Sequence, residues 1–364
     1  MKEKYIIAGI QQVGIGVEHL YEAWKEYIDL FNMDIRILED DKVAELMLPY
    51  TGGKPQQRHA LIAINIQGGG GFEVWQYSGR KPQPLGFTLN MGDLGILACK
   101  VKSRDVARTF EEFSKNPKAN ILGGLQQNID GHQTFYVRDS YGNLFQLVQD
   151  DYIFKDEGHS NGGTVGVTIG VTDIDKAMTV YHDILGYDKI IADEAGVFPD
   201  FEALPSGTQQ FRRRLITHSQ PRKGSLSELF GTSYIELVQA LERTPKKLYE
   251  GRFWGDPGFI QVCFDIRNMD ALRTKCAESG YPFTVDTTQN IKEGNSFDMG
   301  DAAGQFAYIE DPDGTLIEFV ETHKIPVAKK LGLSLNLKNR NPEKPLPKWM
   351  LGMLRFMRVR PEKI

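Results

Sequence analysis

The chain has 364 residues and a formal net charge of −5, and 41% of its residues are hydrophobic. This composition supports a substantial buried core, and no apolar run is long enough to cross a bilayer, so we expect a soluble protein. The acidic total charge and the lack of a recognised base-reading motif argue against nucleic-acid binding.

The start of the chain and its cysteine content both favour the cytoplasm. Residues 1–5 lead within a few positions into the first expected strand, which leaves no room for a signal peptide. The three cysteines form no CxxC motif and suit a reducing compartment. We therefore expect a cytoplasmic protein.

One strand pattern occurs four times along the chain. Its second, fourth and sixth residues are apolar, as in a strand that packs helices on one face and borders a cavity on the other. The copies occupy residues 12–17, 96–101, 166–171 and 261–266. Their first residues, which we expect to face the cavity, are Gln12, Ile96, Gly166 and Gln261.

Segments with helical periodicity follow these strands. In the first unit, the residues that recur at helical spacing are Leu20, Trp24, Tyr27, Ile28 and Phe31. They predict an amphipathic helix that buries one face against the sheet. Ser103 and Asp173 precede two further helical segments and are expected to cap them.

Each unit ends in a strand with a carboxylate or an amide among apolar residues. These polar residues are Glu73, Gln146, Glu236 and Glu318. The turn sequences Asp-Ser-Tyr-Gly (139–142) and Asp-Pro-Asp-Gly (311–314) introduce two of these strands. A carboxylate inside an apolar strand requires a partner, so the repeat points to a metal site.

The repeat divides most of the chain into four units, paired into two halves. We expect an N-terminal half at 1–150, with units at 9–77 and 94–150, and a C-terminal half at 163–322, with units at 163–240 and 257–322. Residues 151–162 show little hydrophobic pattern and are expected to form a linker. The glycine run 68–71 lacks a following Lys-Ser/Thr pair, so we interpret it as a flexible turn and expect no nucleotide cofactor.

Residues 323–364 form a basic C-terminal extension. It holds eleven Lys or Arg residues against two Glu, a formal charge of +9, which leaves −14 on residues 1–322. A Pro-rich connector at 339–347 leads into a basic amphipathic segment at 349–358. We expect its apolar side to pack on the body of a monomer or across a homodimer; anionic lipid or a partner protein is the alternative.

With these strands, turns and glutamates, residues 9–322 resemble the vicinal oxygen chelate superfamily. This superfamily includes glyoxalase I, methylmalonyl-CoA epimerase, extradiol dioxygenases and bleomycin-resistance proteins. The resemblance implies an α+β fold of four βαβββ modules that pair into two cup-shaped halves. It also implies that each module supplies one metal ligand from its first strand and one from its last.

Carried onto this chain, the resemblance gives complete ligand pairs only in modules one and four. The pairs in chain order are Gln12 with Glu73, Ile96 with Gln146, Gly166 with Glu236, and Gln261 with Glu318. If modules one and four share a cup, its implied metal ligands are Gln12, Glu73, Gln261 and Glu318. If neighbouring modules pair instead, the C-terminal half keeps Glu236, Gln261 and Glu318. The sequence leaves this pairing open.

An all-oxygen ligand set favours Mg²⁺, Mn²⁺ or Ca²⁺, with Zn²⁺ and Ni²⁺ as alternatives. With Glu73 and Glu318 as catalytic residues, the resemblance implies an isomerase, epimerase or lyase. Such an enzyme acts through an enediolate or enolate on a small carbonyl substrate. The alternative is a metal-free small-molecule binding protein of the bleomycin-resistance type, in which Phe72, Trp75, Tyr77 and Tyr234 are candidate cavity residues. Without a metal the two glutamates repel, and residues 212–214, all Arg, are candidate partners.

The histidine that usually stands on the first strand of this family is absent from all four modules. Extradiol-type dioxygenases hold Fe(II) with two imidazoles and a carboxylate, so the sequence disfavours that chemistry. None of the seven histidines occupies a ligand position; His59, His132 and His218 are the ones placed to face a cavity.

Overall fold

The computed structural model describes residues 4–290, 297–299, 302–328 and 333–364. The first two modules follow the βαβββ order. Module one contains β1 (Ile6–Gly16), α1 (Leu20–Phe31), η1 (Leu48–Tyr50) between β2 (Ile35–Ala44) and β3 (Gln56–Ile64), and β4 (Gly71–Tyr77). Module two contains β5 (Gly95–Ser103), α2 (Val106–Ser114), β6 (Asn120–Gln127), β7 (Gln133–Arg138) and β8 (Leu144–Gln149).

The third and fourth modules repeat this order with short additional elements. Module three contains β9 (Asn161–Gly170), α3 (Ile174–Met178), η2 (Thr179–Ile184), β10 (Lys189–Gly196), η3 (Pro199–Phe201), β11 (Phe211–Thr217), α4 (Ser227–Phe230) and β12 (Tyr234–Ala240). Module four contains β13 (Gly258–Arg267), α5 (Met269–Glu278), β14 (Val285–Asp286), η4 (Thr287–Asn290), β15 (Phe297–Met299), β16 (Ala302–Glu310) and β17 (Leu316–Ala328).

The C-terminal extension adds a strand and short helices. These are β18 (Leu333–Asn336), α6 (Lys348–Gly352), η6 (Met353–Met357) and η7 (Pro361–Lys363). Residues 1–3, on which part of the expected location rests, and residues 329–332 of the extension lie outside the described residues.

The N-cap residue of one helix is the one expected from the sequence, and that of another helix is a different residue. The Asp173 carboxylate accepts from the backbone N–H groups of Asp175 and Lys176, so it caps α3 as expected. For α2 the cap is Asp105, whose carboxylate accepts from the Arg108 N–H at 2.9 Å. Ser103 ends the preceding strand, and its hydroxyl contacts Thr109 instead.

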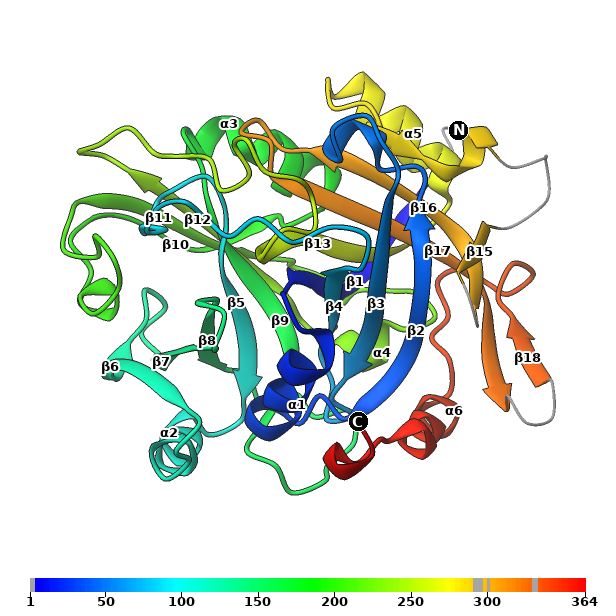
Figure 1. Cartoon of the computed structure of the whole chain (residues 1–364), viewed down its shortest axis with the longest axis horizontal. Helices are drawn as coiled ribbons and strands as arrows, with labels where there is room; N and C mark the ends of the chain where they lie inside the picture. Colours follow the sequence, from blue (N-terminus) through cyan, green and yellow to red (C-terminus); the bar gives the residue numbers. More distant parts are fainter. Residues whose placement is uncertain (1–3, 291–296, 300–301, 329–332) are drawn as a thin grey trace.

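Two curved sheets carry the four modules (Figure 1). In the sheet that we call the outer-module sheet, modules one and four meet in the order β14-β16-β17-β13-β1-β4-β3-β2, with β15 and β18 added at the side. In the inner-module sheet, modules two and three meet in the order β10-β11-β12-β9-β5-β8-β7-β6. The structure thus confirms the α+β fold with two cup-shaped halves, and each sheet takes one module from either side of residues 151–162.

The two sheets have the same internal plan. Their central strands pair antiparallel, β1 with β13 and β5 with β9. Each central strand also pairs in parallel with the last strand of its own module, as the βαβββ order requires. The first and last strands of two modules therefore lie next to one another at the middle of each sheet.

Helices cover one face of each sheet, as strand alternation predicts. Val13 and Ile15 of β1, and Val17 directly after it, are fully buried in the main core together with Trp24 and Phe31 of α1. Gln12, Gly14 and Gly16 alternate with these residues and therefore lie on the opposite face of the sheet. We call this face of each sheet its cup.

Candidate functional site

Four polar side chains meet in the cup of the outer-module sheet. Gln12, Glu73, Gln261 and Glu318 come from β1, β4, β13 and β17. The Gln261 amide nitrogen donates to Glu73 Oε2 at 2.8 Å and to Glu318 Oε2 at 3.0 Å. The Gln12 amide nitrogen lies 3.5 Å from Glu73 Oε2. The structure therefore brings together the set that the pairing of modules one and four implies.

Strand register explains this convergence. Gly14 of β1 pairs with Glu73 across the parallel ladder, and Cys263 of β13 pairs with Glu318 in the same way. Gln12 and Gln261 lie two residues before these paired positions, and their strands are neighbours at the centre of the sheet. Because alternate residues face the same side, all four side chains share the cup face.

A tryptophan fixes the orientation of the Gln261 amide. Trp254 Nε1–H donates to Gln261 Oε1 at 2.6 Å. An indole N–H can only donate, so the amide oxygen faces Trp254 and the amide nitrogen faces the two carboxylates. Gln261 therefore acts as a hydrogen-bond donor that bridges Glu73 and Glu318.

Both carboxylates are held in a setting that disfavours their charged forms. Burial, together with the negative charge of Glu318, raises the pKa of Glu73 to about 8. Burial raises the pKa of Glu318 to about 7, against the opposing effect of hydrogen bonds from Cys263, Tyr308 and Gln261. Gln12, Gln261 and Glu318 are buried, whereas Glu73 is partly exposed, so the site is accessible to solvent at Glu73.

Aromatic side chains surround this polar centre. Trp75 and Tyr77 follow Glu73 on the same face of β4, and Trp254 lies between Trp75 and Tyr308, with ring centroids 4.7 and 6.3 Å away. Trp75 and Tyr77 were candidate cavity residues from the sequence.

The other two aromatic candidates lie elsewhere. Phe72 faces the helices and belongs to the main core, and Tyr234 is on the inner-module sheet with its hydroxyl 3.4 Å from Asp150. Trp254 precedes β13 in an irregular segment, where no sequence periodicity signals its position. Tyr308 pairs directly with Glu318 across the β16–β17 ladder, a register that the sequence analysis did not assign.

The equivalent position in the inner-module sheet is filled by cations from the chain. Lys100 Nζ lies 2.6 Å from Glu236 Oε2 and also donates to Gln146 Oε1. Arg213 donates to the other Glu236 oxygen at 2.7 Å. These two cations hold the pKa of Glu236 down to about 2 despite its burial. Glu236 is thus in a different cup from Gln261 and Glu318, so the structure does not join these three residues.

The expected cavity residue of module two is displaced by a strand irregularity. Parallel pairing places Lys100 opposite Gln146, which makes Ala98, two residues earlier, the counterpart of Gln12. The ladder between β5 and β9 shifts between Ile96 and Ala98, and Ile96 packs in the helix-side core. A single extra residue reverses the face of a strand, so the expectation that Ile96 faces the cavity is wrong.

Comparisons with known proteins agree with this architecture. Residues 167–298 match the family model of the Glyoxalase/Bleomycin resistance protein/Dioxygenase superfamily. The structure is similar to glyoxalase I from Zea mays, with a TM-score of 0.53 and 14% sequence identity over 87% of this chain and 92% of that chain. This family match lies within modules three and four.

The structure is also similar to a putative dioxygenase from Bacillus subtilis. Its TM-score is 0.51 at 13% identity, and the match covers 87% of this chain and 86% of that chain. At these identities the likeness shows the fold alone. No curated protein matches the chain.

Three of the four residues that the family resemblance implies as metal ligands can present an oxygen atom in the outer cup. Glu73 and Glu318 present carboxylate oxygens around one amide nitrogen. Gln12 Oε1 is buried and has no hydrogen-bond partner, so it is an acceptor without a donor. The Gln261 oxygen is already bound by Trp254, so Gln261 does not fit the role of a ligand. Gln12, Glu73 and Glu318 fit a hard divalent cation.

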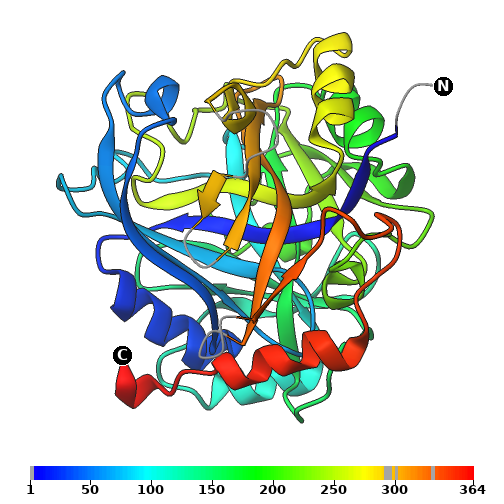
Figure 2. The ribbon, with the colours of Figure 1, turned by 90° about the vertical axis from the view of Figure 1, so that its right-hand side faces the viewer.

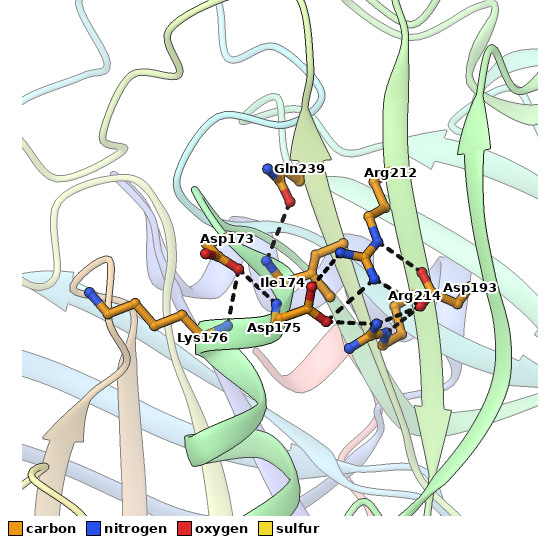
Figure 3. A network of polar contacts seen from close by, with 8 residues as sticks. All are labelled: Asp173, Ile174, Asp175, Lys176, Asp193, Arg212, Arg214 and Gln239. Carbon is orange, nitrogen blue, oxygen red and sulfur yellow. Dashed lines mark hydrogen bonds and ion pairs between the residues drawn. The ribbon is translucent and has the colours of Figure 1, made fainter.

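Within the described residues, no lysine or arginine side chain neutralises Glu73 or Glu318 by an ion pair. Arg58, whose charge acts on Glu73, pairs with Asp40, and no Lys or Arg forms an ion pair with Glu73 or Glu318 there. In the arginine run, Arg213 binds Glu236 and Asp200 in the inner cup. Arg212 and Arg214 bind Asp175 and Asp193 on the outer side of the same sheet (Figure 3).

The three histidines that the sequence places to face a cavity lie away from the four-residue cluster. His59 contacts Glu39 at 3.0 Å and His218 contacts the Gln220 carbonyl at 2.8 Å, while His132 is exposed. In the described ranges, no three or more His, Cys, Asp or Glu side chains gather as a metal site. Among the same residues, no helix has both the length and the apolar character needed to span a membrane.

Proposed function

We propose that this chain is an enzyme that transfers a proton at a carbon next to a carbonyl group, as an isomerase, epimerase or lyase of small carbonyl compounds. The reaction uses Glu73 and Glu318 and a divalent cation, Mg²⁺, Mn²⁺ or Ca²⁺ by ligand chemistry, at Gln12, Glu73 and Glu318. The observation that carries the proposal is the pair of carboxylates, one buried and one partly exposed, that share one amide donor.

The inner cup supports the need for a cation in the outer cup. The two cups have the same strand plan, and in the inner cup Lys100 bridges the counterparts of Glu73 and Glu318. In the outer cup the position of Lys100 is taken by Gly14, which has no side chain. Two carboxylates with unfavourable burial and mutual repulsion therefore depend on protons or on a cation from solution.

The carboxylates suit proton transfer near neutral pH. A general base works best when its pKa is near the working pH, and in the metal-free protein burial brings the pKa values of Glu73 and Glu318 into that range; a bound cation lowers both. Glu73 is the partly exposed member, so it is the one that reaches a substrate C–H bond. It accepts the proton as the C–H electrons move to the carbonyl oxygen, and it or Glu318 returns a proton to carbon.

The remaining residues orient the site. Trp254 fixes Gln261, and Gln261 holds the two carboxylates close together. Trp75, Tyr77 and Tyr308 give the cup an aromatic wall beside the two carboxylates. A divalent cation, when bound, supplies positive charge that stabilises an enolate oxygen.

The cation is tested by elemental analysis and equilibrium dialysis of protein purified without affinity metal. We expect near-stoichiometric Mg²⁺, Mn²⁺ or Ca²⁺ and its loss in Glu73→Gln and Glu318→Gln variants. Asp265→Asn is the matched control, because Asp265 of β13 also carries a buried carboxyl group but lies outside the cluster. Equal metal content in all variants would remove the proposed site.

The proton transfer is tested by hydrogen exchange in D₂O with a panel of 2-oxo and 2-hydroxy carbonyl compounds. Mass spectrometry should detect deuterium at the carbon next to the carbonyl with the native chain, and a rate loss on the order of 10²-fold or more in Glu73→Gln. The Asp265→Asn variant should retain the native rate. If metal-loaded protein introduced deuterium into none of these compounds, the result would contradict the proposal.

One observation favours a second candidate, a metal-free binding protein for a planar ligand. The Gln261 amide can hold a carboxyl–carboxylate pair that shares one proton, and four aromatic residues stand around it. Stable binding of aromatic ligands by metal-free protein, quenching Trp254 fluorescence without any exchange activity, would establish this alternative.

A further inference from the structure

The end of the C-terminal extension is fixed to the body of the molecule along one side. Leu346 and Leu351 are buried in a cluster with Ile35 and Phe154. The Leu346 N–H donates to the Ser225 carbonyl at 2.9 Å, and further along the Val359 N–H donates to the Asp34 carbonyl at 2.9 Å. Figure 2 shows this segment in red along the lower edge of the molecule, near β2.

The other side of the same segment carries two exposed aromatic rings. Trp349 is 68% exposed and Phe356 is 73% exposed, the two largest values among the exposed large hydrophobic residues of the described chain. They line the same groove, so they lie on the same side of the α6–η6 segment. The other tryptophans, at positions 24, 75 and 254, are buried.

Basic side chains accompany these rings. Lys155, Lys348 and Arg355 line a groove of about 380 Å³ together with Trp349 and Phe356. Within the described residues, Lys155 and Arg355 form no ion pair, and Lys348 lies 3.9 Å from a Glu228 oxygen. Arg358, by contrast, is paired with Asp34 and Glu157 and belongs to the attachment of the segment.

We propose that this aromatic-basic face, formed by Lys155, Lys348, Trp349, Arg355 and Phe356, docks on the surface of an anionic phospholipid bilayer. Aromatic rings prefer the boundary between headgroups and acyl chains, and Lys and Arg are attracted to the phosphates of anionic lipids. The formal charge of −14 on residues 1–322 disfavours other contacts of the body with that surface, so the face sets one orientation.

The packing of the segment makes this docking efficient. Its buried side is already attached to the body, so binding requires little ordering of the backbone. The face is separate from Glu73 and Glu318, so its function does not depend on the proposed reaction.

The test uses the full chain and vesicles of phosphatidylcholine alone or mixed with phosphatidylglycerol. We expect sedimentation with the anionic vesicles only, weakened by salt, and a blue shift of tryptophan emission from Trp349, the one exposed tryptophan. The Trp349→Ser/Phe356→Ser and Lys155→Glu/Arg355→Glu variants should each bind about tenfold more weakly or worse.

Matched controls use exposed residues elsewhere. Ile190→Ser/Val197→Ser removes an exposed apolar pair, and Lys54→Glu/Lys115→Glu reverses two exposed cations; both should bind as the native chain does. Unchanged urea unfolding midpoints show that each variant is folded. Equal vesicle binding by all variants would overturn the proposal. So would a concentration-dependent dimer that is lost in Trp349→Ser/Phe356→Ser without vesicle binding, since the face would then join two copies of the chain.

Discussion

At the scale of residues, the two cups differ chiefly in where their positive charge comes from. Gly14 and Lys100 occupy equivalent positions opposite Glu73 and Gln146. Lys100 Nζ fills the inner cup, and Thr168 adds a hydrogen bond to Glu236 at 3.1 Å. Gly14 leaves the corresponding space of the outer cup without a cation. In the inner cup, side chains of the chain itself neutralise the buried carboxylate. In the outer cup, the two carboxylates depend on protons or cations from the solution.

Metal-free protein should lose stability as the pH rises. The folded-state pKa values of Glu73 and Glu318 are raised above the ordinary value of 4.5, so the folded state binds more protons than the unfolded chain above that pH. Their contribution is complete below about pH 4.5 and is lost as the pH passes through 7 to 8. Urea unfolding in the presence of a chelator measures this loss.

The Glu73→Gln variant is the comparison for this pH dependence. It removes one buried charge, so its stability should fall less between pH 6 and pH 8 than that of the native chain. Divalent cations should raise the stability of the native chain most at the alkaline end of the range. A native chain whose stability rises over this interval in chelator would contradict the assigned pKa directions.

Replacing Lys100 should strongly destabilise the fold. Lys100→Met leaves Glu236 with Arg213 alone and removes the donor to Gln146, and breaking a buried ion pair costs about 3–5 kcal/mol. Urea unfolding gives the change in free energy. The Lys100→Met/Glu236→Gln double variant should recover part of the loss, whereas Lys115→Met on the surface should change stability by less than about 0.5 kcal/mol. A neutral Lys100→Met variant would show that the inner cup needs no cation.

At the scale of elements, helix–turn contacts join modules that do not share a sheet. Tyr27 of α1 in module one donates to Asp139 Oδ2 in the turn of module two at 2.7 Å. Tyr181 of η2 in module three makes the same contact with Asp311 Oδ2 in module four at 2.9 Å. The sheets pair modules one with four and two with three, while these contacts pair one with two and three with four.

Removing either tyrosine hydroxyl should weaken the fold by a similar amount. Tyr27→Phe and Tyr181→Phe each leave a buried aspartate without one donor, which costs about 1–3 kcal/mol. Chemical unfolding of both variants, with Asp139→Asn to complete a double-mutant cycle, measures the coupling. Tyr141→Phe is the control, because its hydroxyl reaches the His19 carbonyl at an exposed position. A Tyr27→Phe effect no larger than that of Tyr141→Phe would show that the helix–turn contact contributes little.

Local patterns predicted the modules, and non-local contacts decided the rest. Strand alternation and the glutamate of the last strand depend on neighbouring residues, so they predicted the four units and their cavity-facing positions. The βαβββ order and the set Gln12, Glu73, Gln261 and Glu318 came from the family resemblance. The choice between module pairings depends on the β1–β13 ladder between distant segments, which alternation does not encode. The face of Ile96 was wrongly predicted because the β5 irregularity lies between Ile96 and Ala98, whereas alternation after it holds and places Lys100 on the cup face.

At the scale of the whole molecule, the expected linker is closely attached to module one. Gln67 donates to the carbonyls of His159 and Asn161 and accepts from the N–H groups of Glu157 and His159. The glycine run 68–71 hydrogen-bonds to residues 163 and 164 rather than forming a free turn. A Cβ at position 70 would lie 2.6 Å from the Ile10 carbonyl oxygen, so glycine permits this close approach.

Cutting the chain at the linker should therefore give two fragments that fold only together. Residues 1–156 carry half of each sheet, with the central edges of β1 and β5 unpaired, and residues 157–364 carry the other halves. Unpaired central strands expose backbone groups and apolar faces, so each fragment alone should aggregate or remain unfolded. Co-expressed fragments should co-purify with native circular dichroism, because the β1–β13 and β5–β9 ladders reform both sheets. A stable, monomeric fragment of residues 1–156 with native-like dispersion in its NMR spectrum would contradict this, since it would mean that modules one and two can form a sheet with each other.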